Sequence, residues 1–438
     1  MYGNSFVAFL LGIVEYNPIK YNLPFEMFAG KDFDREPDID LNFSVEVREN
    51  IYEYIKQKYG NVIYAGTIGN IANNTAKNMI DRYSEDLYIN FNKEKEQKLI
   101  QKLCGIKIRE GVHPGGIIIM PKSKDINEYT PIQKYEDAKL KTHIDYHSVM
   151  ENGIYKFDIL SHDTPTILHR LQKLTRVNHK EIDLSNKETL EIFLNVGNEK
   201  SEISTIGIPE FETDYVINML SKVKPRNLND LVCINGLSHG TDTWRWNAQS
   251  LIENRNIPVD KVISNRADIM NYLIENKIER GTAFEIAEFI RKGKASRNIY
   301  PLWKNTELEN QRKEKWEAYK SILREHNIPD WYIKSAEKIK YLFPKSHAIG
   351  YTIDAFKIAW YKVHYPEAFY KVYFDIKGTI NVNDYTSKEQ VERKIKRLEE
   401  KIDDDNSYQY KEKIRELKLI KEMFERNVKN GLYKLRKC

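Results

Sequence analysis

Two aspartates, Asp38 and Asp40, stand two residues apart in the segment Pro37-Asp38-Ile39-Asp40-Leu41-Asn42-Phe43. Polar and apolar residues alternate along this segment, which predicts a β-strand with one side facing solvent. Side chains two residues apart on a strand leave the same face, so both carboxylates point to one place. Two anions held this close repel each other, and one takes up a proton unless a cation lies between them.

A third carboxylate, Asp158, lies in a second predicted strand, residues 154–160, and Lys156 leaves the same face two residues earlier. Mg²⁺ prefers carboxylate oxygens. Three aspartates on neighbouring strands would form a two-metal site for in-line phosphoryl transfer, with the lysine as a point charge on the phosphates. Most aspartate pairs at this spacing are turn residues, helix caps or solvated charges. The spacing alone therefore leaves the catalytic and the structural interpretation open.

The elements that must position these residues belong to two kinds of region. Strand patterns at residues 63–67 and 111–120 accompany a helical pattern at 45–59 and a polar helical stretch at 71–108. Beyond Thr166 almost everything is helical, up to a charged tail at 388–437 that we expect to form exposed helices with i,i+4 ion pairs. These patterns predict an α+β protein with a sheet domain, a helical insertion and a large helical lobe.

The composition sets wide limits. The 438 residues carry a net charge of +5, which permits nucleic-acid binding but does not argue for it. The three cysteines, Cys104, Cys233 and Cys438, lie far apart, so we expect neither zinc nor disulfides. The longest apolar run, Phe6–Val14, is too short to cross a bilayer. We therefore expect a cytoplasmic protein that does not bind membranes.

The residues around the aspartates resemble a known family. Pro37–Ser44 and Lys156–Leu160 are similar to the two aspartate motifs of the C-family bacterial replicative DNA polymerases, in particular the Gram-positive PolC type of DNA polymerase III alpha subunit. Further segments follow in the order found in that family: Gly66–Gly69, His113–Gly116, Thr142–His147, Gly207–Phe211, Gly236–Asp242, Arg291–Lys294 and Phe343–His347.

This resemblance implies a fold and an activity. The expected parts are a nucleotidyltransferase-like palm with a mixed sheet at 1–70 and 111–162, a small helical thumb at 71–110, and helical fingers at 163–438 that include the charged tail. The implied function is a DNA-directed DNA polymerase core. Asp38, Asp40 and Asp158 would hold two Mg²⁺ ions, and the substrates would be deoxynucleoside triphosphates and a primed DNA template.

The resemblance also suggests binding residues, each with a structural alternative. Gly3, Asn4 and Ser5 resemble a phosphate-cradling turn, although Asn4 replaces the usual serine and a simple N-cap is the alternative. Paired glycines let a ligand approach the backbone, or simply form a turn. Basic clusters are often solvated surface, and His239 and Asp242 are comparable cases. The remaining nucleotide-binding candidates are Lys156, His113, Gly115, Gly116, Arg291, Lys292, Lys294, Lys345 and His347, and the DNA-binding candidates are Lys340 and Tyr341.

The chain also departs from the family pattern. Nothing in it resembles the N-terminal OB domain, the PHP domain, the exonuclease or the cysteine-rich segment, which would fall near residues 18–24. Bulky residues, including Trp246, precede Asn247 where the family has smaller ones. We expect a minimal or truncated polymerase core, with separately encoded polymerase subunits or a sliding clamp as further partners. The alternatives are a non-catalytic fragment of a split or degraded gene that binds primer–template DNA, and an unrelated metal-dependent nuclease, which would explain none of the later segments.

Overall fold

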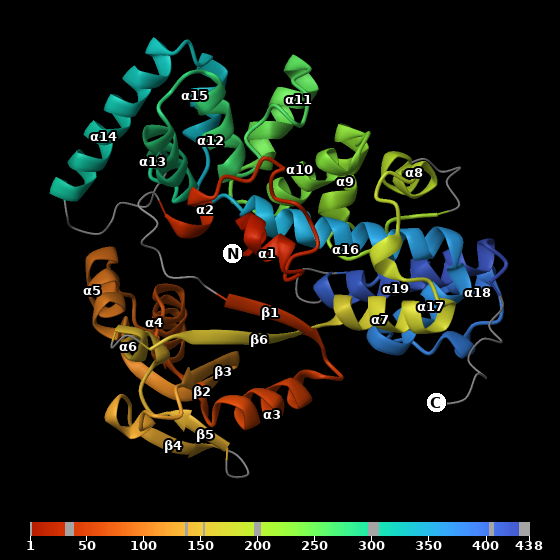
Figure 1. Cartoon of the computed structure of the whole chain (residues 1–438), viewed down its shortest axis with the longest axis horizontal. Helices are drawn as coiled ribbons and strands as arrows, with labels where there is room; N and C mark the ends of the chain where they lie inside the picture. The colour runs from red at the N-terminus through yellow and green to blue at the C-terminus, as the bar shows by residue number, and fades with distance from the viewer. Residues whose placement is uncertain are drawn as a thin grey trace. The chain divides into compact units, whose positions relative to one another are not determined.

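The computed structural model describes residues 2–30, 39–135, 139–151, 154–196, 203–296, 306–402 and 407–428. The chain forms two compact units, one of Asp38–His162 and one that joins Met1–Pro37 to Asp163–Cys438 (Figure 1). Each unit is described by itself. Together they confirm the α+β class expected from the sequence.

A mixed six-stranded sheet forms the first unit, in the order β1-β6-β3-β2-β5-β4. The pairs β1/β6 and β2/β5 are parallel, and the other neighbours are antiparallel. The hairpin of β4 and β5 was not anticipated, because its short strands lack a regular apolar alternation. The strands are β1 Ile39–Ser44, β2 Asn61–Asn70, β3 Lys107–Met120, β4 Ile132–Tyr135, β5 Lys139–Thr142 and β6 Lys156–His162.

Side chains pack on both faces of this sheet because successive strand residues point to opposite sides. On one face the helix α3 (Arg48–Tyr59) places Tyr52 in a stack on Tyr64, with ring centroids 4.6 Å apart. On the other face Ile63 and Ile118 pack near the short helix α6 (Tyr146–Glu151). The central strands are therefore buried on both sides and form a rigid support.

Two helices connect β2 to β3. The stretch predicted to be helical at 71–108 forms α4 (Asn73–Leu87) and α5 (Lys93–Leu103), separated at Tyr88, whose left-handed backbone ends α4. The strands extend beyond the predicted segments, and Ile71 and Ile106 continue the backbone pairing up to the helices.

The second unit is helical, and the long helix α16 lies at its centre with most of its residues buried (Figure 1). Residues of α12–α15 form one hydrophobic cluster, and residues of α7 and α17–α19 form another with α16. The longer helices are α7 Asp163–Thr175, α8 Lys187–Leu194, α9 Asp214–Val223, α10 Leu228–His239, α12 Arg266–Glu275, α13 Arg280–Arg291, α14 Thr306–Glu325, α16 Lys345–His364, α17 Pro366–Lys377, α18 Lys388–Glu399 and α19 Ser407–Glu425; the shorter are α1 Phe6–Leu10, α2 Glu26–Ala29, α11 Gln249–Arg255 and α15 Asp330–Ala336.

The charged tail is less exposed than we predicted. Leu417 and Ile420 on α19 are fully buried in the cluster shared with α17. Glu422 of α19 is also buried and forms an ion pair with Lys362 of α16 at 2.7 Å. The prediction of exposed helices was therefore wrong for α19, because the apolar residues between its charges form a packed face. On α18 only Val391, Ile395 and Leu398 are buried, and i,i+4 ion pairs of the predicted kind join Lys388 to Glu392 and Lys421 to Glu425. Residues 429–438 lie outside the described part of the chain.

The first residues of the chain pack with the helical unit, whereas we had assigned residues 1–70 to the palm. Tyr16 donates a hydrogen bond to the carbonyl oxygen of Ser346 at 2.8 Å, and Arg266 donates one to the carbonyl of Met27 at 2.8 Å. Met27 is buried among helical-unit residues. Among the described residues, no helix has the length and apolar character that crossing a bilayer requires.

Gly66 provides a test of the sheet packing. A Cβ atom there would lie 2.2 Å from the carbonyl oxygen of Thr142, so Gly66→Ala must displace β5 from β2. We expect the free energy of unfolding to fall by about 1–3 kcal/mol, as overpacking generally costs, measured by urea denaturation. Gly111→Ala is the matched control, because its Cβ would meet only the Thr67 hydroxyl, which can rotate. Equal losses for both variants would contradict this account.

Candidate active site

Asp40 and Asp158 are directly opposite each other on the parallel strands β1 and β6. Residues paired in register point to the same face of a sheet, so the two carboxylates share one side. Asp40 is exposed, while Asp158 is only 8% exposed. Asp38, the third predicted carboxylate, lies outside the described residues.

Lys156 is the immediate ionic partner of Asp158. Its Nζ lies 2.5 Å from Oδ2 of Asp158, and both side chains are about nine-tenths buried. The same ammonium lies 5.1 Å from the centre of the Tyr146 ring. A carboxylate and a lysine two residues apart on one strand therefore form a largely desolvated pair, as their shared face predicted.

The other carboxylate oxygen of Asp158 has no such partner. Oδ1 is buried and accepts no hydrogen bond from the described residues. Nδ1 of His113 lies 3.6 Å from it. A buried carboxylate oxygen without a donor is costly. This oxygen, next to the in-register Asp40, fits a hard divalent cation such as Mg²⁺.

His113 lies beside this oxygen without donating to it. The backbone N–H of Gly115 donates to Nδ1 at 3.3 Å, which assigns the lone pair of the ring to that nitrogen. Burial lowers the pKa of His113, and the charge of Lys156 lowers it further, against the attraction of Asp158. The ring is therefore neutral, and its edge contacts the Tyr146 ring at a centroid distance of 5.5 Å.

The two glycines of this segment are required by the protein's own packing. A Cβ at Gly115 would lie 2.8 Å from the carbonyl oxygen of Ile159, and one at Gly116 would lie 2.8 Å from Nδ1 of His113. Gly116 pairs with Asp158 across β3 and β6. These contacts give each glycine a role in packing, and the predicted approach of a nucleotide to their backbone stays a prediction.

Two site residues escaped the sequence interpretation. Tyr146 contacts both Lys156 and His113. The neighbouring Asp145 fixes the position of Tyr146, because its carboxylate accepts hydrogen bonds from Ile68 N–H at 2.9 Å and His147 N–H at 3.0 Å. Burial would raise the pKa of Asp145, but these hydrogen bonds outweigh it and the pKa is lowered. The family-like segment 142–147 was the available signal.

Arg48 is the second site residue that the sequence interpretation missed. From the start of α3 it donates to the carbonyl of Ile159 at 3.2 Å and to the carbonyl of Pro114, so it ties β6 to β3. A lone arginine at a helix start carries no distinctive sequence pattern, so this residue had no signal that could have revealed it.

In the helical unit, Arg291, one of the predicted basic residues, and Arg266 both contact the buried carboxylate of Glu288. Both guanidinium groups hydrogen-bond Glu288, Arg266 at 2.6 Å and Arg291 at 3.0 Å. Burial would raise the pKa of Glu288, but the two arginines outweigh it and lower the pKa to about 2. Lys292 lies 3.7 Å from the same carboxylate and is exposed, as is Lys294.

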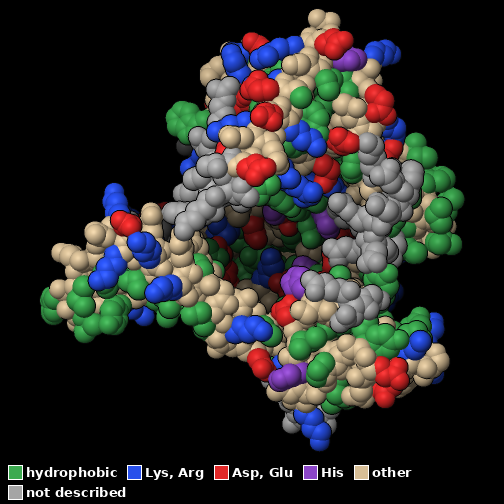
Figure 2. All heavy atoms as spheres, turned by 90° about the vertical axis from the view of Figure 1, so that its left-hand side faces the viewer, with side chains coloured by type: hydrophobic (Ala, Val, Ile, Leu, Met, Phe, Trp, Pro, Cys, Tyr) green, Lys and Arg blue, Asp and Glu red, His purple; other side chains and the backbone are tan. Residues whose placement is uncertain are grey.

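Three family-like segments meet in this unit. Gly293 packs on the backbone of Lys340, and Tyr341 forms a β-bridge with Thr241. Lys340 forms an ion pair with Asp242 at 2.8 Å. Chain segments far apart in sequence thus form one small surface. Acidic side chains are interspersed with basic ones over the helices at the top of Figure 2, so charge alone does not single out a binding face.

The predicted histidines belong to a column of rings. His239 stacks on Phe343 at 4.6 Å, and Phe343 lies 5.9 Å from the ring of His347. Nε2 of His239 lies 2.5 Å from Glu210, which brings two further family-like segments together. Burial would raise the pKa of Glu210, but the hydrogen bond with His239 outweighs it and lowers the pKa.

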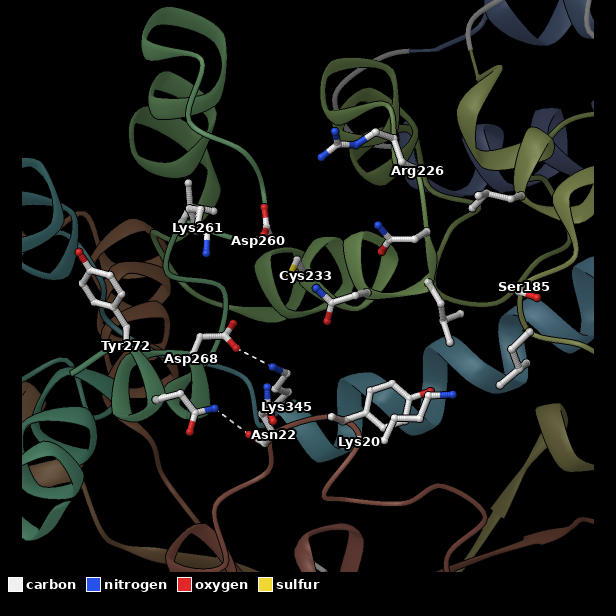
Figure 3. Close-up of a pocket in the computed structure, with 18 of the residues that line it drawn as sticks. Lys20, Asn22, Ser185, Arg226, Cys233, Asp260, Lys261, Asp268, Tyr272 and Lys345 are labelled. Carbon is white, nitrogen blue, oxygen red and sulfur yellow. Dashed lines mark hydrogen bonds and ion pairs between the residues drawn. The ribbon is translucent and has the colours of Figure 1, made fainter. Parts of the chain in front are cut away.

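Lys345 takes a different position. It is buried in the wall of a cavity of about 950 Å³ inside the helical unit, where its Nζ lies 2.7 Å from Asp268 (Figure 3). Burial opposes its charge, but the attraction of Asp268 outweighs this and raises the pKa of Lys345. Cys233 and Tyr272 line the same cavity.

The N-terminal candidates lie against the start of α16. Gly3 packs on the Tyr16 hydroxyl and the side chain of Ser346, leaving no room for a Cβ. Ser5 accepts a hydrogen bond from Ala8 N–H at 3.2 Å, so it caps α1, and Asn4 donates to the carbonyl of Pro24 at 2.9 Å. Gly3 and the segment with Lys345 and His347 are thus neighbours.

Over the ranges that the structure describes, no three His, Cys, Asp or Glu side chains are grouped closely enough to hold a metal ion. Asp38 falls outside those ranges, so the predicted aspartate triad is represented there by Asp40 and Asp158 only.

Two family models match adjacent parts of the chain. Residues 2–95 and 85–161 match the family model of the bacterial DNA polymerase III alpha NTPase domain. Residues 164–314 match that of the bacterial DNA polymerase III alpha subunit finger domain. The two matches adjoin each other near the start of α7.

Curated relatives carry the name DNA polymerase III PolC-type. That of Caldanaerobacter subterraneus subsp. tengcongensis is 39% identical over 430 residues, covering 93% of this chain and 29% of the relative. Those of Bacillus subtilis and Mycoplasmopsis pulmonis are 41% and 40% identical, covering 82% and 89% of this chain but 24% and 27% of the relatives. This chain belongs to the PolC-type DNA polymerase III alpha subunit family, and it spans between 24% and 29% of the length of these relatives.

Lys156→Met tests the ion pair. The substitution leaves Asp158 buried without its counter-charge, which should lower the free energy of unfolding by about 3 kcal/mol, measured by urea denaturation without divalent metal. The double variant Lys156→Met/Asp158→Asn should recover most of that loss, because no buried charge remains. A single variant as stable as the parent protein would exclude a buried pair.

Acid titration tests the Glu288 cluster. The pKa of Glu288 is lowered from 4.5 to about 2 on folding, so its stabilising contribution is complete above pH 4.5 and is lost as the pH falls toward 2. Between pH 5 and 3, the stability advantage of the parent protein over Glu288→Gln should shrink by about 2 kcal/mol. A pH-independent difference between the two proteins would contradict this assignment.

Proposed function

We propose that this chain carries the nucleotidyl-transfer centre of a DNA-directed DNA polymerase, which adds deoxynucleotides to the 3′ hydroxyl of a DNA primer. The observation that carries the proposal is the in-register pair of Asp40 and Asp158, one oxygen of which is buried without a donor. Membership of the PolC-type family supports it.

Asp40 and Asp158, with Asp38 on the grounds of resemblance, would hold two Mg²⁺ ions. Bound there, the cations would supply charge stabilisation for an in-line phosphoryl transfer. In that transfer the primer hydroxyl would give its proton to solvent water and form a bond to the α-phosphorus, while the bond from that phosphorus to the pyrophosphate oxygen breaks and pyrophosphate departs.

The chain's own residues orient this reaction. Lys156, already beside Asp158, is a point charge for the incoming triphosphate. The Tyr146 ring contacts both the Lys156 ammonium and the His113 ring, and these contacts restrict the side-chain positions of Lys156 and His113. A neutral His113 leaves the net charge at the carboxylates unchanged.

The binding roles in the helical unit belong to the same proposal. Lys294 is exposed and available to phosphates, and Lys292 is exposed but lies 3.7 Å from Glu288. Arg291 and Lys345 are held by acids. Phosphate binding at Gly3, Asn4 and Ser5 would use the backbone, since the side chains of Asn4 and Ser5 make hydrogen bonds within the protein. Lys340 and Tyr341 would contact primer–template DNA, and His347 would contact the nucleotide.

The domain names follow the same reasoning: a palm built on the sheet, a thumb of α4 and α5, and fingers formed by the helices from α7 onward. Primer–template DNA and deoxynucleotides are the proposed partners, along with separately encoded polymerase subunits or a sliding clamp. A cytoplasmic location accords with that substrate. The second candidate is a non-catalytic fragment that binds primer–template DNA, which family membership alone would equally allow.

Primer extension distinguishes the two candidates. With a primed template, Mg²⁺ and four deoxynucleotides, we expect template-directed extension that falls at least a hundredfold in Asp40→Asn and in Asp158→Asn, on the order of losing a group used in the transition state. DNA binding, measured in parallel by fluorescence anisotropy, should remain.

Asp375→Asn is the control, because it makes the same change at an exposed position on α17 in the helical unit. Extension by the aspartate variants at the parental rate would refute the metal assignment. DNA binding by the parent protein without extension would favour the non-catalytic fragment.

A further inference from the structure

A tight turn between α10 and α11 holds a tryptophan in an unusual backbone conformation. Trp246 has φ +59° and ψ 7°, in the left-handed region that favours glycine. The neighbouring Trp244 is buried in the helical core. The sequence singled out this turn because its bulky residues depart from the family pattern.

The surrounding structure fixes the turn firmly. The Asn247 amide is buried and donates to the carbonyls of Asp242 and Ser335 at 3.0 and 3.2 Å. The Ser335 hydroxyl donates to Oδ1 of Asn247 at 2.6 Å, and Lys338 donates to the carbonyl of Trp246. The backbone that carries Trp246 is therefore rigid.

The indole itself points into solvent. Trp246 is 82% exposed, whereas Trp244 and Trp316 are 2% and 5% exposed. Core packing therefore gives no reason for an aromatic ring at this position. A rigid backbone that presents a large apolar ring to water is the geometry of a binding contact.

The groups around the ring are mostly cationic. Arg245 is exposed and its guanidinium lies over the Tyr215 ring at 5.7 Å. Lys338 is exposed beside the turn, and Lys340 follows two residues later. Asp242 lies in the segment just before the turn, and Lys340 forms an ion pair with its carboxylate at 2.8 Å.

A second exposed ring lies on the same surface. Tyr341 is 39% exposed, and its backbone pairs with Thr241, five residues before Trp246. Aromatic rings interleaved with cations suit an anionic polymer whose bases are free to stack. Paired bases in a duplex are already stacked on each other and present only their edges, so such a surface favours unpaired DNA.

We propose that Trp246, with Tyr341, Arg245, Lys338 and Lys340, is a binding platform for single-stranded DNA, namely the unpaired template strand. The inference rests on the proposed function in that DNA is the substrate. Trp246 stacks on a base, the cations contact the flanking phosphates, and sequence preference is weak because every base has an aromatic face.

The left-handed backbone allows a variant that removes the ring without straining the fold. Trp246→Gly removes the ring and places the residue best suited to φ +59° at that position. We expect its thermal unfolding midpoint to equal or exceed that of the parent protein. Its dissociation constant for a fluorescein-labelled oligothymidylate, measured by anisotropy without metal or nucleotide, should rise about tenfold, the effect of one lost stack.

Two matched comparisons complete the experiment. Tyr408→Ala removes a ring that is 76% exposed on α19 and should leave oligothymidylate binding unchanged. Trp246→Phe keeps an aromatic face and should retain most of the affinity. A blunt duplex should bind the parent protein and Trp246→Gly equally.

The outcomes separate this inference from the proposed catalysis. Equal oligothymidylate affinity for the parent protein and Trp246→Gly, or an equal loss on blunt duplex, overturns the platform even if primers are extended. Trp246-dependent binding of the oligothymidylate in a protein that extends no primer keeps the platform and rejects the catalytic proposal.

Discussion

The parallel register between β1 and β6 is the constraint on which the candidate active site depends. It sets Asp40 beside Asp158, although the two residues are far apart in the sequence. Slipping either strand by one residue would turn one carboxylate to the opposite face. β3 pairs with β6 on its other side, and a side chain at Gly115 would collide with the backbone of Ile159 on β6.

The charges at this site form a small system of matched groups. Lys156 neutralises one oxygen of Asp158, and the other oxygen remains without a donor. Burying a charge is tolerable when it is paired, so the lysine allows the carboxylate to be largely buried while one oxygen is kept for a cation. Tyr146 contacts the lysine, and His113 lies beside the carboxylate oxygen that has no donor. Asp145 anchors the start of α6, where Tyr146 lies, by its hydrogen bond with Ile68.

The helical unit uses buried ion pairs in a similar way, but for structure. Glu288 joins Arg266 to Arg291, Asp268 holds Lys345, and Glu422 holds Lys362. The pairs Arg266–Glu288, Asp268–Lys345 and Lys362–Glu422 each link two different helices, whereas Arg291 lies on the same helix as Glu288. Basic residues within family-like segments are therefore divided between those that bind the protein itself and those, such as Lys292 and Lys294, that remain exposed.

The sequence by itself determined the elements and the chemistry that depend on local periodicity. Alternation along 37–43 and 154–160 predicted two strands, and the spacing of Lys156 and Asp158 placed both on one face. Only the tertiary structure decided which residues meet: Tyr146 with Lys156, Gly3 with Ser346, and α19 with α16. It also showed that Lys345 lines a cavity and that the paired glycines serve strand packing. The physical reason is that strand and helix periods fix the direction of a side chain relative to its own element, whereas its partners depend on contacts between segments distant in the chain.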